Sequence, residues 1–235
     1  MRFPNAFKGV SKLFAAEILK LIAAGLIVAG GIATLFGSAG VIYEVSEGAE
    51  LTEQLVAANI SPVPVVVGFA LVGAAMILFI IAYIMNLVGL GQASRDEENF
   101  RNAFIVSIIV LIISVATAII TGTNVAAGMG GNISQLARTI AEIIVMVSVI
   151  MGVQNLARYL GDSGEEVLGN RIITTIMVSL IVSAAASFIS IFFNNSVMYT
   201  IDGILGIISG IAMIVAYISY IVFHGRAKRI LREGQ

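Results

Sequence analysis

The chain has 235 residues, of which 59% are hydrophobic and only 11% are charged. Soluble domains carry about 25% charged residues, so this composition excludes an ordinary water-soluble protein. The net charge is −1, and we expect no nucleic-acid partner because the basic residues flank the apolar stretches. The absence of cysteine excludes disulfides, thiolate metal sites and cysteine nucleophiles.

Long stretches without a formal charge indicate membrane spans. A helix needs about 20 apolar residues to cross the roughly 30 Å hydrocarbon core. Because unpaired backbone groups are costly in lipid, such spans have to be helices. We therefore predict one integral membrane domain over residues 1–235, an all-α polytopic membrane bundle of six transmembrane helices. The predicted spans lie near 14–42, 63–90, 102–122, 137–159, 171–193 and 200–224.

The first predicted element precedes the first span. Phe3, Phe7, Val10 and Phe14 recur at helical spacing, with lysines off that stripe. This pattern predicts a short interfacial N-terminal helix that lies in the headgroup region. The alternative is that the same residues form the start of the first span.

Small residues recur every fourth position in several spans, most regularly at Gly25, Ala29, Ala33 and Gly37 of the first. Further series include Ser179, Ser183 and Ser187 in the fifth span and Gly206 and Gly210 in the sixth. Small residues allow two backbones to approach closely where lipid provides no hydrophobic driving force. They predict packing within the monomer or, alternatively, contact between copies in a homo-oligomer.

Polar side chains near the cytoplasmic ends of the even-numbered spans form one candidate ligand site. Tyr83 and Asn86 share a face of the second span, Asn155 lies in the fourth, and Tyr217 and Tyr220 lie in the sixth. Such groups can line a small-molecule pocket. They are equally consistent with an aromatic belt and hydrogen bonds between helices.

Three charged residues near the external ends form a second candidate site. Glu142 lies sixteen residues before Arg158, or about 24 Å along a helix, which places it just inside the external boundary. Arg138 lies one turn earlier and can pair with it. Asp202 lies at the start of the sixth span and is either its N-terminal cap or first-turn anion, or a further cation ligand.

The distribution of Lys and Arg predicts the orientation. Twelve of the thirteen lie near the same set of span ends, and only Arg138 lies on the opposite side. The twelve are Arg2, Lys8, Lys12, Lys20, Arg95, Arg101, Arg158, Arg171, Arg226, Lys228, Arg229 and Arg232. Short basic loops remain in the cytoplasm. We therefore predict a multi-pass protein of the cell membrane with both termini cytoplasmic.

A weak internal repeat is visible. Ile84-Met85 and Asp96 recur 66 residues later, and Ala82-Tyr83-Ile84 recurs 134 residues later. The spacing predicts three repeated helical hairpins, over 1–95, 96–161 and 162–235. The alternative is that unrelated membrane hairpins share similar flanks.

Two functions are consistent with these features. The first is binding or transport of a small molecule or ion through the helical bundle. The alternative is a non-catalytic structural or accessory subunit that acts through helix packing, with a homo-oligomer or another membrane protein as partner. The chain has one histidine and no HExxH, GxGxxG or P-loop motif, so we expect no enzyme, no cofactor and no metal site.

Overall fold

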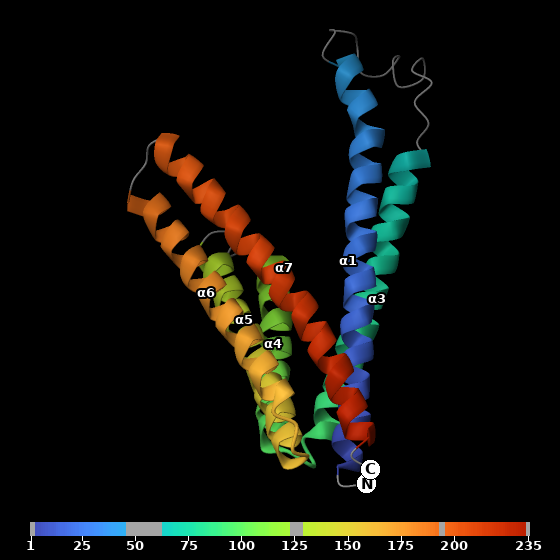
Figure 1. Cartoon of the computed structure of the whole chain (residues 1–235). Coiled ribbons are helices and arrows are strands. Elements are labelled where there is room, and N and C mark those ends of the chain that lie inside the picture. Colours follow the sequence, from blue (N-terminus) through green and yellow to red (C-terminus); the bar gives the residue numbers. More distant parts are fainter. Residues whose placement is uncertain (1–2, 46–62, 123–128, 193–195, 234–235) are drawn as a thin grey trace. The chain divides into compact units, whose positions relative to one another are not determined.

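The computed structural model describes residues 3–45, 63–122, 129–192 and 196–233. These residues form six helices and no strand, which confirms the predicted all-α class (Figure 1). The helices are α1 (Pro4–Val45), α3 (Val63–Ala93), α4 (Glu98–Gly122), α5 (Met129–Tyr159), α6 (Gly164–Phe192) and α7 (Ser196–Glu233).

Five helices contain segments that are long and apolar enough to cross a membrane, as a multi-pass membrane protein requires. These segments are Pro4–Leu35, Val63–Ala93, Glu98–Ala116, Ile140–Tyr159 and Ile207–Glu233. The remaining predicted span, 171–193, extends beyond the side chains that the structure describes, and it stays a prediction.

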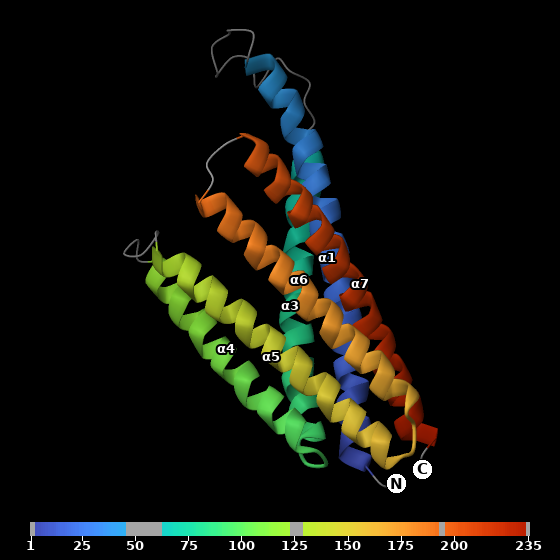
Figure 2. The same ribbon diagram turned by 60° about the vertical axis from the view of Figure 1, so that its left-hand side comes forward.

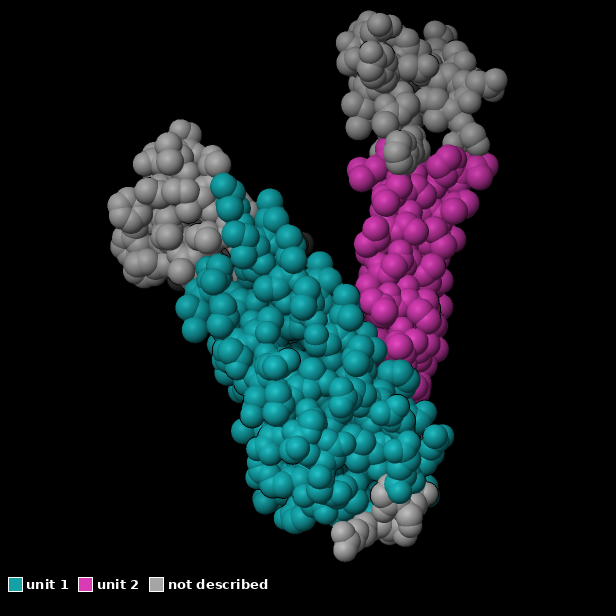
Figure 3. All heavy atoms as spheres, viewed as in Figure 1, with its two compact units in different colours: residues 1–14, 87–235 teal, residues 15–86 magenta. Residues whose placement is uncertain are grey.

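The chain divides into two compact units (Figure 3). Unit 1 comprises residues 1–14 and 87–235, and unit 2 comprises residues 15–86. Within unit 1, α4 lies beside α5 and α6 lies beside α7, each pair antiparallel (Figures 1 and 2). Unit 2 consists of most of α1 and α3.

The core of unit 1 lies where the predicted cytoplasmic ends of its helices meet. It contains the start of α1, the end of α3, the start of α4, the end of α5, the start of α6 and the end of α7. Its largest fully buried apolar side chains are Leu13, Leu90, Phe100, Ile150, Leu156, Ile172, Ile176 and Phe223. The buried core of unit 1 therefore lies next to charged turns and charged helix ends.

The N-terminal stripe belongs to the first turns of α1, which runs without interruption from Pro4 to Val45. Val10 is fully buried, Phe3 and Phe7 pack on the core of unit 1, and the Phe14 ring lies against Gly225 of α7. The separate interfacial helix is therefore not confirmed. The stripe packs against protein, with the Phe3 ring beside Tyr159 of α5 and the Phe14 ring beside α7.

A small-residue seam joins α1 and α3 in unit 2. Gly30 approaches Gly68 so closely that an added Cβ would lie 2.8 Å from the Gly68 carbonyl oxygen. The buried small residues on the two helices recur every seven positions, at Ala16, Ala23 and Gly30 and at Gly68, Ala75 and Ala82. The same spacing continues in unit 1 to Gly9 and Gly89, whose backbones also approach closely.

The predicted stripe of the first span is not this seam. Gly25 has nothing within 4 Å of an added Cβ, and Ala29 is exposed. Gly25 is two residues after Ala23, which turns it about 200° away from the seam. Gly25 and Ala29 therefore face away from the seam within unit 2, whereas Ala33 is half-buried and Gly37 lies outside the described side chains.

A buried hydrogen bond joins α6 and α7. The Ser209 hydroxyl donates to the Ser179 carbonyl oxygen at 2.9 Å, and the Ser179 hydroxyl donates to the Thr175 carbonyl of its own helix. Such bonds between helices contribute about 0.6 kcal/mol on average in membrane proteins. The expected role of Ser179 as a packing residue is confirmed, whereas Gly210, one residue from Ser209, faces open space.

Candidate functional site

Each helix pair contains a glutamate on or just before its first helix and a polar partner on its second. We call these three contacts the glutamate ties. They are Glu17 with Asn86, Glu97 with Asn155, and Glu165 with Arg226.

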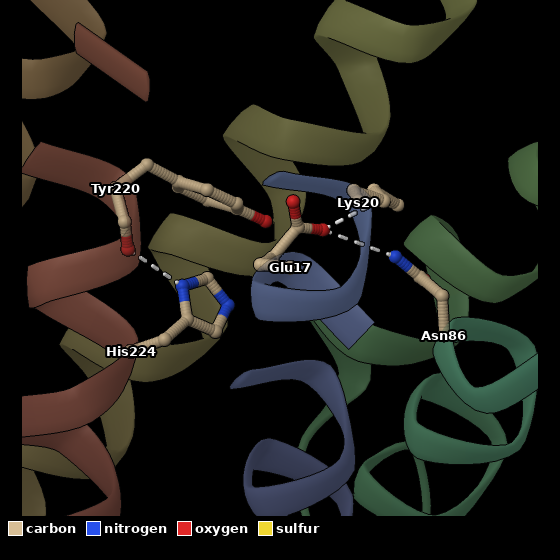
Figure 4. A network of polar contacts seen from close by, with 5 residues as sticks. All are labelled: Glu17, Lys20, Asn86, Tyr220 and His224. Atoms are coloured by element: carbon tan, nitrogen blue, oxygen red, sulfur yellow. Dashed lines mark hydrogen bonds and ion pairs between the residues drawn. The ribbon is translucent and has the colours of Figure 1, made fainter. Parts of the chain in front are cut away.

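The first tie lies in unit 2, between α1 and α3 (Figure 4). Glu17 Oε1 accepts hydrogen bonds from Lys20 Nζ at 2.7 Å and from Asn86 Nδ2 at 3.4 Å. The Glu17 side chain is 5% exposed and lies within the apolar segment Pro4–Leu35. An acidic residue in such a segment is costly unless it is paired, and Lys20, one turn later, supplies the opposite charge.

The second tie combines a helix cap with a contact between helices. Glu97 Oε2 accepts hydrogen bonds from the backbone amides of Asn99 at 2.8 Å and Phe100 at 3.4 Å, at the start of α4. Its Oε1 accepts from the Asn99 side chain and from Asn155 Nδ2 at 3.0 Å. The carboxylate therefore satisfies amides that the first turn leaves unpaired and fastens α4 to α5. Gly152 makes room, because a Cβ there would lie 2.8 Å from Glu97 Oε2.

The third tie joins the start of α6 to the end of α7. Glu165 is fully buried, and Oε1 lies 2.6 Å from Arg226 Nε. Burial raises the pKa of the Glu165 carboxyl above its ordinary value. The Asp162 charge acts in the same direction, and the guanidinium groups of Arg226 and Arg229 oppose it. The cost of removing the Glu165 carboxylate from water therefore exceeds the stabilisation from its attraction to Arg226 and Arg229.

The aspartates of the two internal loops have different roles, although the loops have similar sequences. Asp96 caps α1, since its carboxylate accepts from the Ala6 amide at 2.7 Å and the Asn5 side chain at 2.9 Å. Asp162 accepts from the Gly164 amide at 2.8 Å, within its own turn. Asp96 thus holds the N-terminus of the chain to the α3–α4 turn, whereas Asp162 shapes the α5–α6 turn.

A fourth polar contact fixes α6 on α5. Gln154 Nε2 donates to the Glu166 carbonyl at 2.8 Å and to Asn170 Oδ1 at 3.0 Å. Gln154 is buried, and the absence of a side chain at Gly169 allows it to fit, because a Cβ there would lie 2.5 Å from Nε2. This contact connects the α4–α5 pair to the α6–α7 pair.

The aromatic and imidazole groups of α7 are packed together. His224 is fully buried, and its Nδ1 lies 2.9 Å from the Tyr220 carbonyl oxygen (Figure 4). The centroids of the His224 and Tyr220 rings are 4.2 Å apart, and the two rings lie edge to face. Phe223 contacts the imidazole from another side. His224 is thus a packed residue of unit 1, and the described residues contain no group of His, Cys, Asp or Glu that could hold a metal ion.

The predicted cytoplasmic ligand residues are largely engaged with other protein groups. Asn86 and Asn155 belong to glutamate ties, and Tyr220 is buried beside His224. Tyr83 and Tyr217 are half-buried.

The predicted external site is described only at Glu142, which is exposed on α5. The side chains of Arg138 and Asp202 lie outside the described residues, as do those of two further predicted packing residues, Ser183 and Gly206. The pairing of Glu142 with Arg138 therefore stays a prediction.

Two hollows lie near the predicted cytoplasmic ends of α5 and α7. A void of about 10 Å³, lined by apolar side chains, has room for at most one water. An open surface hollow of about 430 Å³ is lined by Leu160, Gly161, Asp162, Ser163, Ile230 and Glu233. None of the predicted ligand residues lines either hollow.

Sequence reasoning missed the three carboxylates of the ties. The sequence alone assigns no role to Glu17, Glu97 or Glu165, although each has an amide or guanidinium partner more than 50 residues away. A usable signal was present at Glu97, because an acidic residue before the apolar run of α4 is typical of a helix cap. No comparable local pattern indicates Glu17 or Glu165.

Comparison with protein families, with curated proteins and with solved structures finds no match to this chain. Its function therefore has to be inferred from its own residues. No activity, ligand or partner is transferred to it from another protein.

Proposed function

We propose that this chain is a non-catalytic integral membrane subunit that acts through helix packing and through association with other membrane proteins. The observation that carries the proposal is the use of its polar groups. Glu17, Glu97 and Glu165 fasten helices to each other, and the two asparagines with the best prospects as ligands are their partners. Polar groups committed to holding helices together are unsuited to taking up and releasing a solute.

The exposed stripe of α1 supports association in the bilayer. Gly25 and Ala29 do not pack within unit 2, so their small size serves no contact there. Small residues on a lipid-facing surface favour close approach of a second helix. A second copy of the chain is the simplest partner for this face.

Cysteine crosslinking tests this association, because the chain contains no native cysteine. Ala29→Cys should form a disulfide-linked dimer in native membranes. Ile27→Cys, also exposed on α1, serves as the control and should crosslink much less because it lies on a different face. Purification in mild detergent should recover an oligomer or a partner. Equal crosslinking at both positions together with a clean monomer would refute the proposal.

Transport of an ion or small molecule is the second candidate, and Glu142 is the observation that favours it. Its carboxylate lies in the apolar segment Ile140–Tyr159 and is exposed there. We expect that, if the chain transports a solute, Glu142→Gln abolishes pH-dependent uptake into proteoliposomes, because the variant cannot bind a proton or cation. Uptake by the variant at the wild-type rate would exclude a role for Glu142.

We also propose that the three helix pairs derive from one hairpin and that both termini are cytoplasmic. One glutamate tie in each pair supports the first proposal. Contact of Phe14 near the N-terminus with Gly225 near the C-terminus supports the second, because it places the two termini at the same end of unit 1.

A further inference from the structure

The carboxylate of Glu165 is poorly satisfied for a buried charge. Both oxygens are enclosed, and neither accepts a well-aligned hydrogen bond from the described residues, although Arg226 Nε lies 2.6 Å from Oε1. An ionised carboxylate can accept about four hydrogen bonds. Leaving buried acceptors unmet is costly, whereas a protonated carboxyl group carries no charge to solvate.

The surrounding charges compensate only part of this cost. On α7, the side chain of Arg226 is 46% exposed, and Arg229 is shared with Glu233 at 3.8 Å. In the α5–α6 turn, Asp162 adds a negative charge near Glu165. The remaining neighbours, Arg158 of α5 and Glu166 of α6, pair with each other at 2.6 Å, so their charges largely cancel.

We propose that Glu165 is a proton-binding switch at the junction of α6 and α7. Protonation stabilises the packing of the first turn of α6 against the end of α7, and ionisation loosens it. This inference goes beyond the proposed function and does not depend on it. In the predicted topology the junction is cytoplasmic, so the switch responds to the pH of the cytosol.

The direction in which the stability of this packing changes with pH follows from proton linkage. Desolvation raises the pKa of Glu165 in the packed state, whereas the loosened state gives the carboxyl its ordinary value. Between these two values the packed state binds more protons than the loosened state. Stability of the packing therefore rises as the pH falls through this window, and it is lost as the pH rises through the raised pKa.

Hydrogen exchange of the full-length protein in detergent micelles tests the switch. The readout is amide protection in residues 164–168, measured from about pH 5 to about pH 8 and corrected for intrinsic exchange rates. Wild-type protection should increase up to about tenfold per pH unit on acidification within the window. Glu165→Gln mimics the protonated form, and it should show high protection at every pH. The control Glu166→Gln changes the neighbouring, partly exposed glutamate and should keep the wild-type pH response.

A second variant keeps the test decisive if Glu165→Gln does not fold. Arg226→Gln removes the cation that stabilises the ionised form, so its protection transition should move to higher pH. Wild-type protection that is constant or falls on acidification would overturn the proposal. So would an Arg226→Gln transition at the wild-type pH. Lower protection in Glu165→Gln than in wild type at neutral pH would show that the ion pair, and not the proton, holds the junction.

Discussion

Gly30→Ala should destabilise the α1–α3 pair by about 1–3 kcal/mol, the usual cost of an overpacked interface. The new Cβ would lie 2.8 Å from the Gly68 carbonyl oxygen and 3.0 Å from Val72 Cγ2. The carbonyl is part of the α3 backbone and cannot rotate away, so the two helices would have to separate. Circular dichroism of SDS-induced unfolding in mixed micelles measures the change.

Gly25→Ala is the matched control, on the same helix and with the same chemical change. Nothing lies within 4 Å of its added Cβ, and alanine is about 1 kcal/mol better than glycine inside a helix. This variant should therefore be as stable as wild type or more stable. Equal losses in both variants would mean that the seam does not hold α1 and α3 together.

Glu97→Ala should destabilise unit 1 by about 2–4 kcal/mol, because it removes a helix cap and a hydrogen bond between helices together. The amides of Asn99 and Phe100 and the side chain of Asn155 all lose their acceptor. Thermal unfolding in detergent, followed by circular dichroism, gives the stability. Hydrogen exchange at Asn99 and Phe100 reports the loss of the cap directly.

Glu98→Ala is the control for this variant. Glu98 adjoins Glu97, but its side chain is 77% exposed and its ion pair with Arg101 is long, at 3.9 Å. Exposed pairs of this kind contribute little to stability, so the control should unfold close to wild type. Equal losses of stability in Glu98→Ala and Glu97→Ala would mean that the negative charge of the turn stabilises unit 1, and that the hydrogen bonds of Glu97 do not.

The membrane spans could be predicted well from the sequence, but the lengths of the helices could not. The predicted span 63–90 is close to α3, whereas α1 starts ten residues before the predicted 14–42 and α7 continues nine beyond the predicted 200–224. Hydropathy detects the part of a helix that lies in lipid. The charged turns at its predicted cytoplasmic end resemble a loop by composition, yet they remain helical because they pack in the core of unit 1.

The packing face between α1 and α3 does not follow the predicted four-residue period. A four-residue spacing led to Gly25 and Ala29, whereas the buried seam follows a seven-residue spacing through Ala16, Ala23 and Gly30. Both periods occur in the same helix, and sequence alone does not say which one faces a partner. The corresponding seven-residue series on α3 was a signal that could have decided between them.

The polar contacts were predicted in part. Asn86 and Asn155 were correctly identified as polar groups inside the bundle, but their carboxylate partners were not. Partners 69 and 58 residues away are brought together by the antiparallel packing of two helices. Composition and local periodicity contain no information on which pairs of side chains meet at that level.

The seven-residue seam restricts how α1 and α3 can move. Sliding one helix along the other by a single residue would place bulky side chains where glycine and alanine now meet. Small residues would meet again only after a shift of seven positions, or about 10.5 Å. A repeat of this period also winds two helices around each other with a left-handed twist. Axial translation of α1 against α3 within unit 2 is therefore blocked, and the parts of the two helices in this unit have to move together.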